Sequence, residues 1–329
     1  MLTIESDIPV EASALTDINC LRISRFKMDF SALDPIELPR YSGSAWRGLF
    51  GQSLKRAVCV TREPECHQCL LYRSCVYSYI FETPRPNHAD RMRLYHSVPH
   101  PFIISPDGKT SIKSGEKFYA TVTLLGRAVD HLPYIVHAFR EGGKLGLGRN
   151  KAHYQLNAVL QEQTTGSKQW QSILLNHSSL TTLPPKLAVI PPVPDKITLH
   201  LLTPLRLRVN NCYVNGSTLE FHHWFDSLLR RISMLNYFHE DIDLKIDYVN
   251  LSNFSKQITF TKKTIEWKDL TRYSSRQNTT MKMGGFMGSL EINNVDLTPI
   301  WPLLWVGQWT HVGKFTVMGL GQYIIESED

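Results

Sequence analysis

Four of the six cysteines lie close together, with the spacing Cys59-x6-Cys66-x2-Cys69-x5-Cys75. A CxxC pair lets two thiolates hold one ion, and the two outer cysteines can complete a tetrahedron of sulfur ligands. In a reducing compartment this spacing predicts a structural zinc site rather than disulfides. An iron–sulfur cluster, which also takes four thiolates, and unligated thiols are the alternatives. Because sulfur would fill all four positions, we expect no chemistry from the metal.

Two glycine-rich segments contain the next residues that could do chemistry. They are GGKLGLGRNK (142–151) and HVGKFTVMGLGQY (311–323). Each follows an expected helix and precedes an expected strand, which is the reverse of a dinucleotide-binding fingerprint and argues against a Rossmann site. Exposed loop amides can form an anion-binding nest beside cations, here Lys144, Arg149, Lys151 and Lys314. The alternative is a helix C-cap with a tight turn, which needs only one or two glycines.

The elements that must position these residues occur twice in the same order. In the first half, hydrophobic patterning predicts strands and helices at 19–30, 42–58, 101–105, 116–128, 131–143 and 152–160. In the second half, the corresponding segments are 196–209, 219–238, 256–267, 281–292, 298–309 and 321–326. Both halves read β-α-β-β-α-β. We therefore expect an α+β protein of two tandem ferredoxin-like (RRM-like, βαββαβ) domains, with glycine-rich loops and a cysteine-rich metal-binding insertion.

The expected domain boundaries follow from composition. Residues 1–161 form the N-terminal domain, with the cysteine-rich insertion at 59–79, and residues 196–329 form the C-terminal domain with the second glycine-rich loop. Residues 162–195, rich in Thr, Ser, Gln and Pro, are the expected linker. No apolar run approaches the ~20 residues of a membrane helix, and no signal peptide is recognisable. We expect a cytoplasmic protein without membrane association, and its net charge of +6 favours a polyanionic partner.

Six segments between Tyr41 and Tyr323 resemble the RAMP superfamily of CRISPR-associated proteins, and within it the precursor-crRNA processing endoribonucleases. They are YSGSAWRGLFGQSLKRAV, CVYSYIFE, GGKLGLGR, TPLRLR, RYSSRQNTTMKMGGFMGSLEI and HVGKFTVMGLGQY. The resemblance implies an endoribonuclease that recognises CRISPR repeat RNA and cuts precursor crRNA without a catalytic metal. The RNA 2′-hydroxyl would attack the adjacent phosphate and leave a 2′,3′-cyclic phosphate and a 5′-hydroxyl. The reaction needs a general base, a general acid and a cation over the developing phosphorane charge.

His311 is the histidine expected to transfer protons, because it lies beside Gly313 and Lys314 in a segment that matches the family. Lys314 would neutralise phosphate oxygens. Well-known family members carry their histidine in or near the first helix, whereas residues 38–58 contain none. That segment offers Tyr41, Ser42, Arg47 and Lys55 instead, and the loop after it offers His96 and His100.

The segment RYSSRQ contains the remaining expected RNA contacts, Arg272, Arg276 and Gln277. Arginines on a loop suit phosphates or guanine edges, and a solvated charged turn is the alternative. With Lys144, Arg149 and Lys151 they form the expected RNA-binding set. Should the catalytic groups be missing, the resemblance implies a catalytically inactive RAMP subunit. Such a subunit would bind crRNA within an effector complex, and its partners would include the other subunits.

Overall fold

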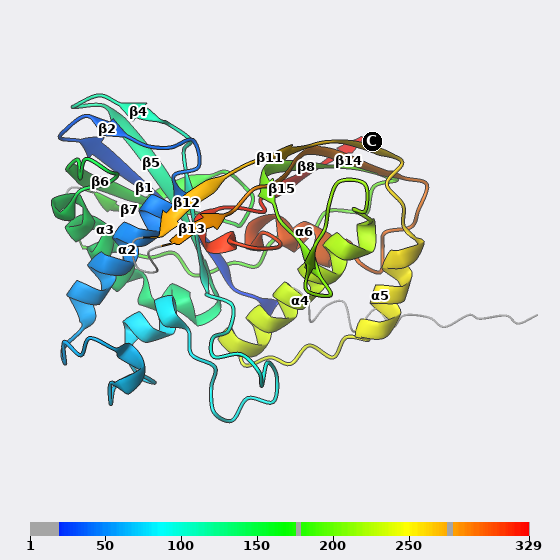
Figure 1. Cartoon of the computed structure of the whole chain (residues 1–329), viewed down its shortest axis with the longest axis horizontal. Coiled ribbons are helices and arrows are strands. Elements are labelled where there is room, and N and C mark those ends of the chain that lie inside the picture. The colour runs from blue at the N-terminus through cyan, green and yellow to red at the C-terminus, as the bar shows by residue number, and fades with distance from the viewer. Residues whose placement is uncertain (1–19, 176–178, 275–278, 329) are drawn as a thin grey trace, which may run out of the picture.

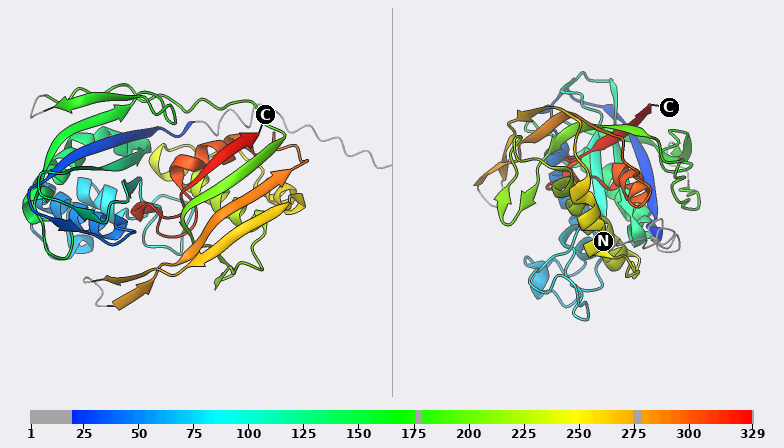
Figure 2. Two further views of the ribbon diagram at one scale, coloured as in Figure 1. Left: turned by 90° about the horizontal axis from the view of Figure 1, so that it is seen from above. Right: turned by 90° about the vertical axis from the view of Figure 1, so that its right-hand side faces the viewer.

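The computed structural model describes residues 20–175, 179–274 and 279–328. Two antiparallel sheets lie next to each other along the long axis of the molecule, and helices cover them (Figures 1 and 2). Within the described residues, no helix is long and apolar enough to cross a lipid bilayer.

The first sheet has the strand order β3-β5-β1-β6-β7. Its elements are β1 (Ile23–Ala32), β2 (Ile36–Glu37), α2 (Gly43–Val58), β3 (Phe102–Pro106), β4 (Ser111–Ile112), β5 (Lys117–Leu125), α3 (Leu132–Leu145), β6 (Tyr154–Glu162) and β7 (Trp170–Leu175). The strand β7 lies within residues 162–195, the segment predicted to be a linker. That segment therefore contributes an edge strand to the first sheet.

The helix α2 forms because its apolar residues recur at helical spacing and meet an aromatic core. Trp46, Phe50 and Leu54 are at most 1% exposed. The ring of Trp46 stacks on that of Phe30 from the central strand β1, with ring centroids 5.1 Å apart. Phe50 stacks on Phe139 of α3 at 5.2 Å. These contacts fix one face of α2 to the sheet and leave the opposite face for solvent or a ligand.

The second sheet has the order β11-β14-β8-β15. Its unit contains β8 (Lys196–Leu205), β9 (Arg208–Val209), β10 (Cys212–Tyr213), α4 (Phe221–His239), α5 (Tyr248–Gln257), β11 (Lys262–Lys268), β12 (Thr271–Ser274), β13 (Thr279–Lys282), β14 (Gly285–Asn293), α6 (Trp301–Thr310) and β15 (Tyr323–Glu328). The strands β12 and β13 pair only with each other and extend toward α2 (Figure 1). The predicted β-α-β-β-α-β order is thus present in both halves, with short elements added.

The glycine-rich loops close onto the protein's own backbone. The amides of Gly146, Gly319 and Gly321 donate hydrogen bonds to the carbonyls of Gly142, Thr316 and Pro204. All three donor glycines have positive φ, and added Cβ atoms would lie within 2.8 Å of other carbonyl oxygens. These three amides are therefore used within the protein, as the alternative of a helix C-cap and tight turn requires.

The second loop also joins the two units. The short helix η5 (Thr316–Met318) contacts both β3 and α2 of the first unit. A Cβ on Gly43, the first residue of α2, would lie 1.9 Å from the carbonyl oxygen of Met318. Val317, Met318 and Leu320 belong to the same buried hydrophobic cluster as the first sheet. This loop therefore completes the core of the other unit.

Candidate nucleic-acid interface

A hollow of about 1710 Å³ lies between α2, the cysteine-rich segment and the start of β12, and we call it the first groove. Its lining includes six cationic side chains: Arg47, Lys55, Arg56, Arg73, Arg149 and Arg272. Only two carboxylates line it, Glu65 and Glu82. A concave surface lined mainly by cations concentrates positive potential and attracts a polyanion.

The outward face of α2 forms one wall of the first groove. Because Trp46 and Phe50 point into the core, Arg47, Gln52 and Lys55 lie on the other face and line the groove. The guanidinium of Arg47 lies over the ring of Phe81, 4.3 Å from its centroid. This contact orients an arginine at the groove wall.

Two residues of the predicted RNA-binding set, Arg149 and Arg272, line the first groove from opposite units. The Arg272 guanidinium is 3.8 Å from the sulfur of Met318. Burial lowers the pKa of Arg272, and within the described parts of the chain no carboxylate offsets that effect. A partly desolvated arginine without an acidic partner interacts strongly with an incoming phosphate.

Side chains in the first groove of types that can exchange protons include Tyr41, His67 and His96. The Tyr41 hydroxyl donates to the sulfur of Met287, 2.9 Å away. His96 is exposed on the loop that leads to β3. Sequence analysis raised Tyr41 and His96 only as alternatives. Tertiary packing brings Tyr41 and His96 into the same groove as Arg272.

His311 lies in the core, so the structure corrects its expected catalytic role. Its side chain is 3% exposed, and Nδ1 donates a hydrogen bond to the carbonyl oxygen of Leu320 at 3.1 Å. Burial lowers the pKa of His311 to about 3. A neutral imidazole held away from solvent cannot reach an RNA backbone, and its role is to join the end of α6 to the following loop.

Lys314 lies in a second groove, of about 680 Å³, between α4 and the loop before β3. One carboxylate, Asp226, lines this groove. Six cations line it: Arg206, Arg208, Arg230, Arg231, Lys256 and Lys314. Arg231 donates through Nε to the carbonyl of Thr310 at 2.7 Å, and burial lowers its pKa to about 10. Its Nη2 has no hydrogen-bond partner among the described residues. With six cations and one carboxylate in its lining, the second groove is also suited to an anion.

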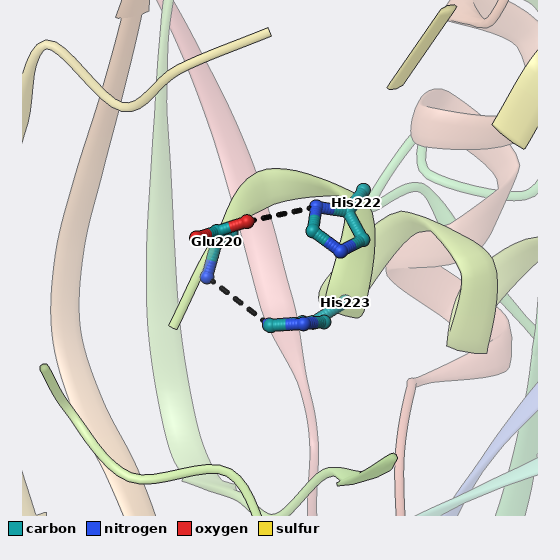
Figure 3. A group of neighbouring side chains, drawn as sticks. All are labelled: Glu220, His222 and His223. Carbon is teal, nitrogen blue, oxygen red and sulfur yellow. Dashed lines mark hydrogen bonds and ion pairs between the residues drawn. The ribbon is translucent and has the colours of Figure 1, made fainter. Parts of the chain in front are cut away.

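Glu220, His222 and His223 form a cluster at the start of α4 (Figure 3). Nδ1 of His222 lies 3.2 Å from a carboxylate oxygen of Glu220, and the amide of Glu220 donates to Nδ1 of His223 at 3.4 Å. Reciprocal capping of the helix explains the arrangement. The two histidines line the cationic second groove, whose charge disfavours a bound cation.

The other predicted RNA-binding residues are not brought together. Lys144 is exposed and pairs with Glu141, with Nζ 2.8 Å from the carboxylate. Lys151 is exposed and lines neither groove. Arg276 and Gln277 lie outside the described residues.

The four clustered cysteines line one small cavity of about 30 Å³. None forms a disulfide. Their sulfurs are not drawn together: among the described residues, only Glu220, His222 and His223 form a group of three or more potential metal ligands within 4.8 Å of one another. The cysteine-rich segment thus converges on one cavity without forming a closed tetrahedron.

Comparison with known proteins gives the family. Residues 199–323 match the family model of the CRISPR-associated endoribonuclease Cas6. Residues 21–186, about half of the chain, match the model described as "AF_1859_N: N-terminal domain". The chain belongs to the RAMP-like Cas6 proteins. Its mixed α+β architecture of antiparallel sheets is also that of solved Cas6 structures.

The solved structure of Thermus thermophilus Cas6 has a TM-score of 0.52 and 15% identity, and the match covers 93% of this Cas6-family chain and 99% of that chain. A Cas6 product complex has a TM-score of 0.56, again with 15% identity and with 93% and 99% coverage. An uncharacterized protein of Archaeoglobus fulgidus is 26% identical over 175 residues, 52% of this chain and 57% of the relative. The match thus spans little more than half of that relative's length. The likeness to the solved structures shows a shared fold.

Proposed function

We propose that this Cas6-family protein binds CRISPR repeat RNA in the first groove and cuts precursor crRNA there. The observation that carries the proposal is the set of six cations around one groove, drawn from segments as far apart as α2 and β12. A chain that folds these segments together presents a positive track to a phosphate backbone. The two β-α-β-β-α-β halves, with sheet orders β3-β5-β1-β6 and β11-β14-β8-β15, support a pair of ferredoxin-like domains as its scaffold.

The proposed reaction uses the RNA's own 2′-hydroxyl. A base removes the 2′-proton, the oxygen attacks the adjacent phosphorus, and the 5′-oxygen leaves with a proton from an acid. Arg47 and Arg272 are placed to stabilise the charge on the phosphorane oxygens. His96 is the proposed proton-transfer residue, because its imidazole is exposed, lines the first groove and belongs to the side-chain type that most often transfers protons in catalysis. We propose Tyr41 as its partner.

The second groove would bind an adjacent stretch of the same RNA. Its six cations support phosphate binding there. Lys314 would then act in binding rather than in cleavage. A separate site for the flanking strand allows a protein to grip the RNA without distorting the scissile nucleotide.

The test incubates purified protein with repeat RNA in EDTA and follows the cyclic-phosphate product. His96→Ala should lower the single-turnover rate by about 10²–10⁴-fold, the usual contribution of a general acid or base. His88→Ala is the matched control, because His88 is exposed on the same loop and lines neither groove. Full cleavage by His96→Ala would refute that assignment. Cleavage of a repeat with deoxyribose at the scissile nucleotide would refute the 2′-hydroxyl mechanism.

A catalytically inactive subunit that binds crRNA within an effector complex is the second candidate. It is favoured by the absence of histidine from α2 and by the burial of His311. In that case, the wild type would bind several repeat RNAs tightly and leave all of them intact. Cleavage by the wild type that is abolished in an Arg47→Ala, Arg272→Ala variant would decide for the enzyme.

A further inference from the structure

The cysteine-rich segment folds back against the end of α2. Cys59 is the C-cap of that helix, and its amide donates to the carbonyl of Lys55 at 2.9 Å. Cys66 begins the 3₁₀ helix η2 (Cys66–Gln68) and Cys69 is its C-cap. Cys75 lies one turn before Tyr79, whose amide donates to its carbonyl at 2.9 Å. All four side chains line the same cavity of about 30 Å³.

We propose that Cys59, Cys66, Cys69 and Cys75 bind one Zn²⁺ ion in this cavity. The ion would join the segment 66–75 to the end of α2. The proposal rests on the cysteine geometry and not on the proposed function.

The backbone already provides the chelating turn. The amide of Cys69 donates to the carbonyl of Cys66 at 3.1 Å, which closes a 3₁₀ turn. Side chains three residues apart on such a turn eclipse each other, so both thiols of the CxxC face the same way. Tetrahedral ligation with Zn–S bonds of ~2.3 Å needs sulfurs about 3.8 Å apart. Each sulfur is attached by one rotatable bond, so closing the site calls for rotamer changes at the cysteines.

The surroundings suit four thiolates around a dication, a unit with a net charge of −2. The ammonium group of Lys55 lies near the thiol of Cys66 and donates to the carbonyl of Pro64 at 3.1 Å. The Thr61 hydroxyl lies 3.3 Å from the sulfur of Cys69. Hydrogen bonds and cations beside thiolate ligands stabilise such a charge. The four cysteines share this one small cavity, which offers a single metal position.

The ion would shape one wall of the first groove. His67, Tyr72 and Arg73 lie between or beside the ligating cysteines and line that groove. Only one short helix, η2, lies between Cys59 and Cys75. A metal that holds this segment would therefore set where those three side chains lie.

The test measures metal in the full-length protein after exhaustive dialysis. We expect about one zinc per chain in the wild type and in the control variants Cys20→Ser and Cys212→Ser, whose cysteines lie outside the cavity. Cys66→Ser and Cys69→Ser should contain almost none. Zinc retained in both of these variants would overturn the proposal, and its loss in His222→Ala would move the ion to the cluster at the start of α4.

A second measurement uses only the wild type, because cysteine variants can fail to fold. Metal-free protein prepared with a chelator should bind Co²⁺ with the absorption of tetrahedral thiolate ligation, and Zn²⁺ should displace it. Zn²⁺ should also raise the thermal unfolding midpoint of the metal-free protein by ~5 °C or more. A brown iron-containing protein, or no Co²⁺ absorption and no thermal shift, would overturn the proposal.

Discussion

RNA affinity should depend on salt through specific cations of the first groove. Arg149→Ala with Arg272→Ala removes two groove cations contributed by different units. Lys144→Ala with Lys151→Ala is the matched control, because it removes the same net charge from residues that line neither groove. The comparison therefore separates local phosphate contacts from the long-range effect of net charge.

The expected size follows from counterion release. Each phosphate neutralised on a single strand contributes about 0.7 to the slope of log affinity against log salt, so six contacts give a slope of about 4.2. Between about 50 and 200 mM salt, wild-type affinity should fall about 300-fold. The groove variant loses two contacts, its slope falls to about 2.8, and its affinity should fall only about 50-fold over the same range.

The assay is a fluorescence-anisotropy titration of labelled repeat RNA at several salt concentrations. The lysine control should keep the wild-type slope even if its affinity falls slightly. Equal slopes for the two double variants would refute the placement of RNA in the first groove. A wild-type slope near zero would refute an electrostatic interface altogether.

Two further predictions concern stability. Burial lowers the pKa of His311 to about 3 and that of His239 to about 4, whereas the unfolded chain protonates histidine near pH 6.5. The contribution of these two histidines to the free energy of unfolding is therefore complete above about pH 6.5. It is lost as pH falls toward about 4, by up to about 1.4 kcal/mol for each histidine and each pH unit. Urea unfolding at several pH values should show a shallower loss for His311→Asn, and an unchanged slope would contradict this. In the same assay, Gly321→Ala should cost about 3 kcal/mol or more, because its Cβ would lie 1.8 Å from the carbonyl oxygen of Val312. Gly108→Ala, with positive φ but open space, should cost about 1 kcal/mol, and equal losses would refute the steric argument.

The order of elements could be predicted because hydrophobic spacing reflects burial directly. The spacing of Trp46, Phe50 and Leu54 predicts helix α2, and the alternation in 116–128 predicts β5. The strand β7 was missed because its neighbours are rich in Ser, Thr and Pro, which obscure a short edge strand. The paired strands β12 and β13 were not predicted, because their position is fixed by contacts with the other unit.

The candidate site was less predictable, because it depends on which surfaces meet. The Gly and Lys beside His311 suggested exposure, yet the loop returns into the core and buries the imidazole. Arg47 and Lys55, which the sequence offered as alternatives to a histidine in this segment, lie opposite the apolar face of α2. That Arg272 faces them across a groove follows only from tertiary structure.

The loop after α6 places part of the first unit's interior late in the chain. Val317, Met318 and Leu320 belong to the core cluster of the first unit, and η5 contacts β3 and α2, although the last strand of the first sheet ends at Leu175. During synthesis the first unit therefore has an apolar opening beside α2 until these residues have been made. Folding of the first half cannot be completed independently, so fragments divided between the units should aggregate when made separately and assemble only when made together.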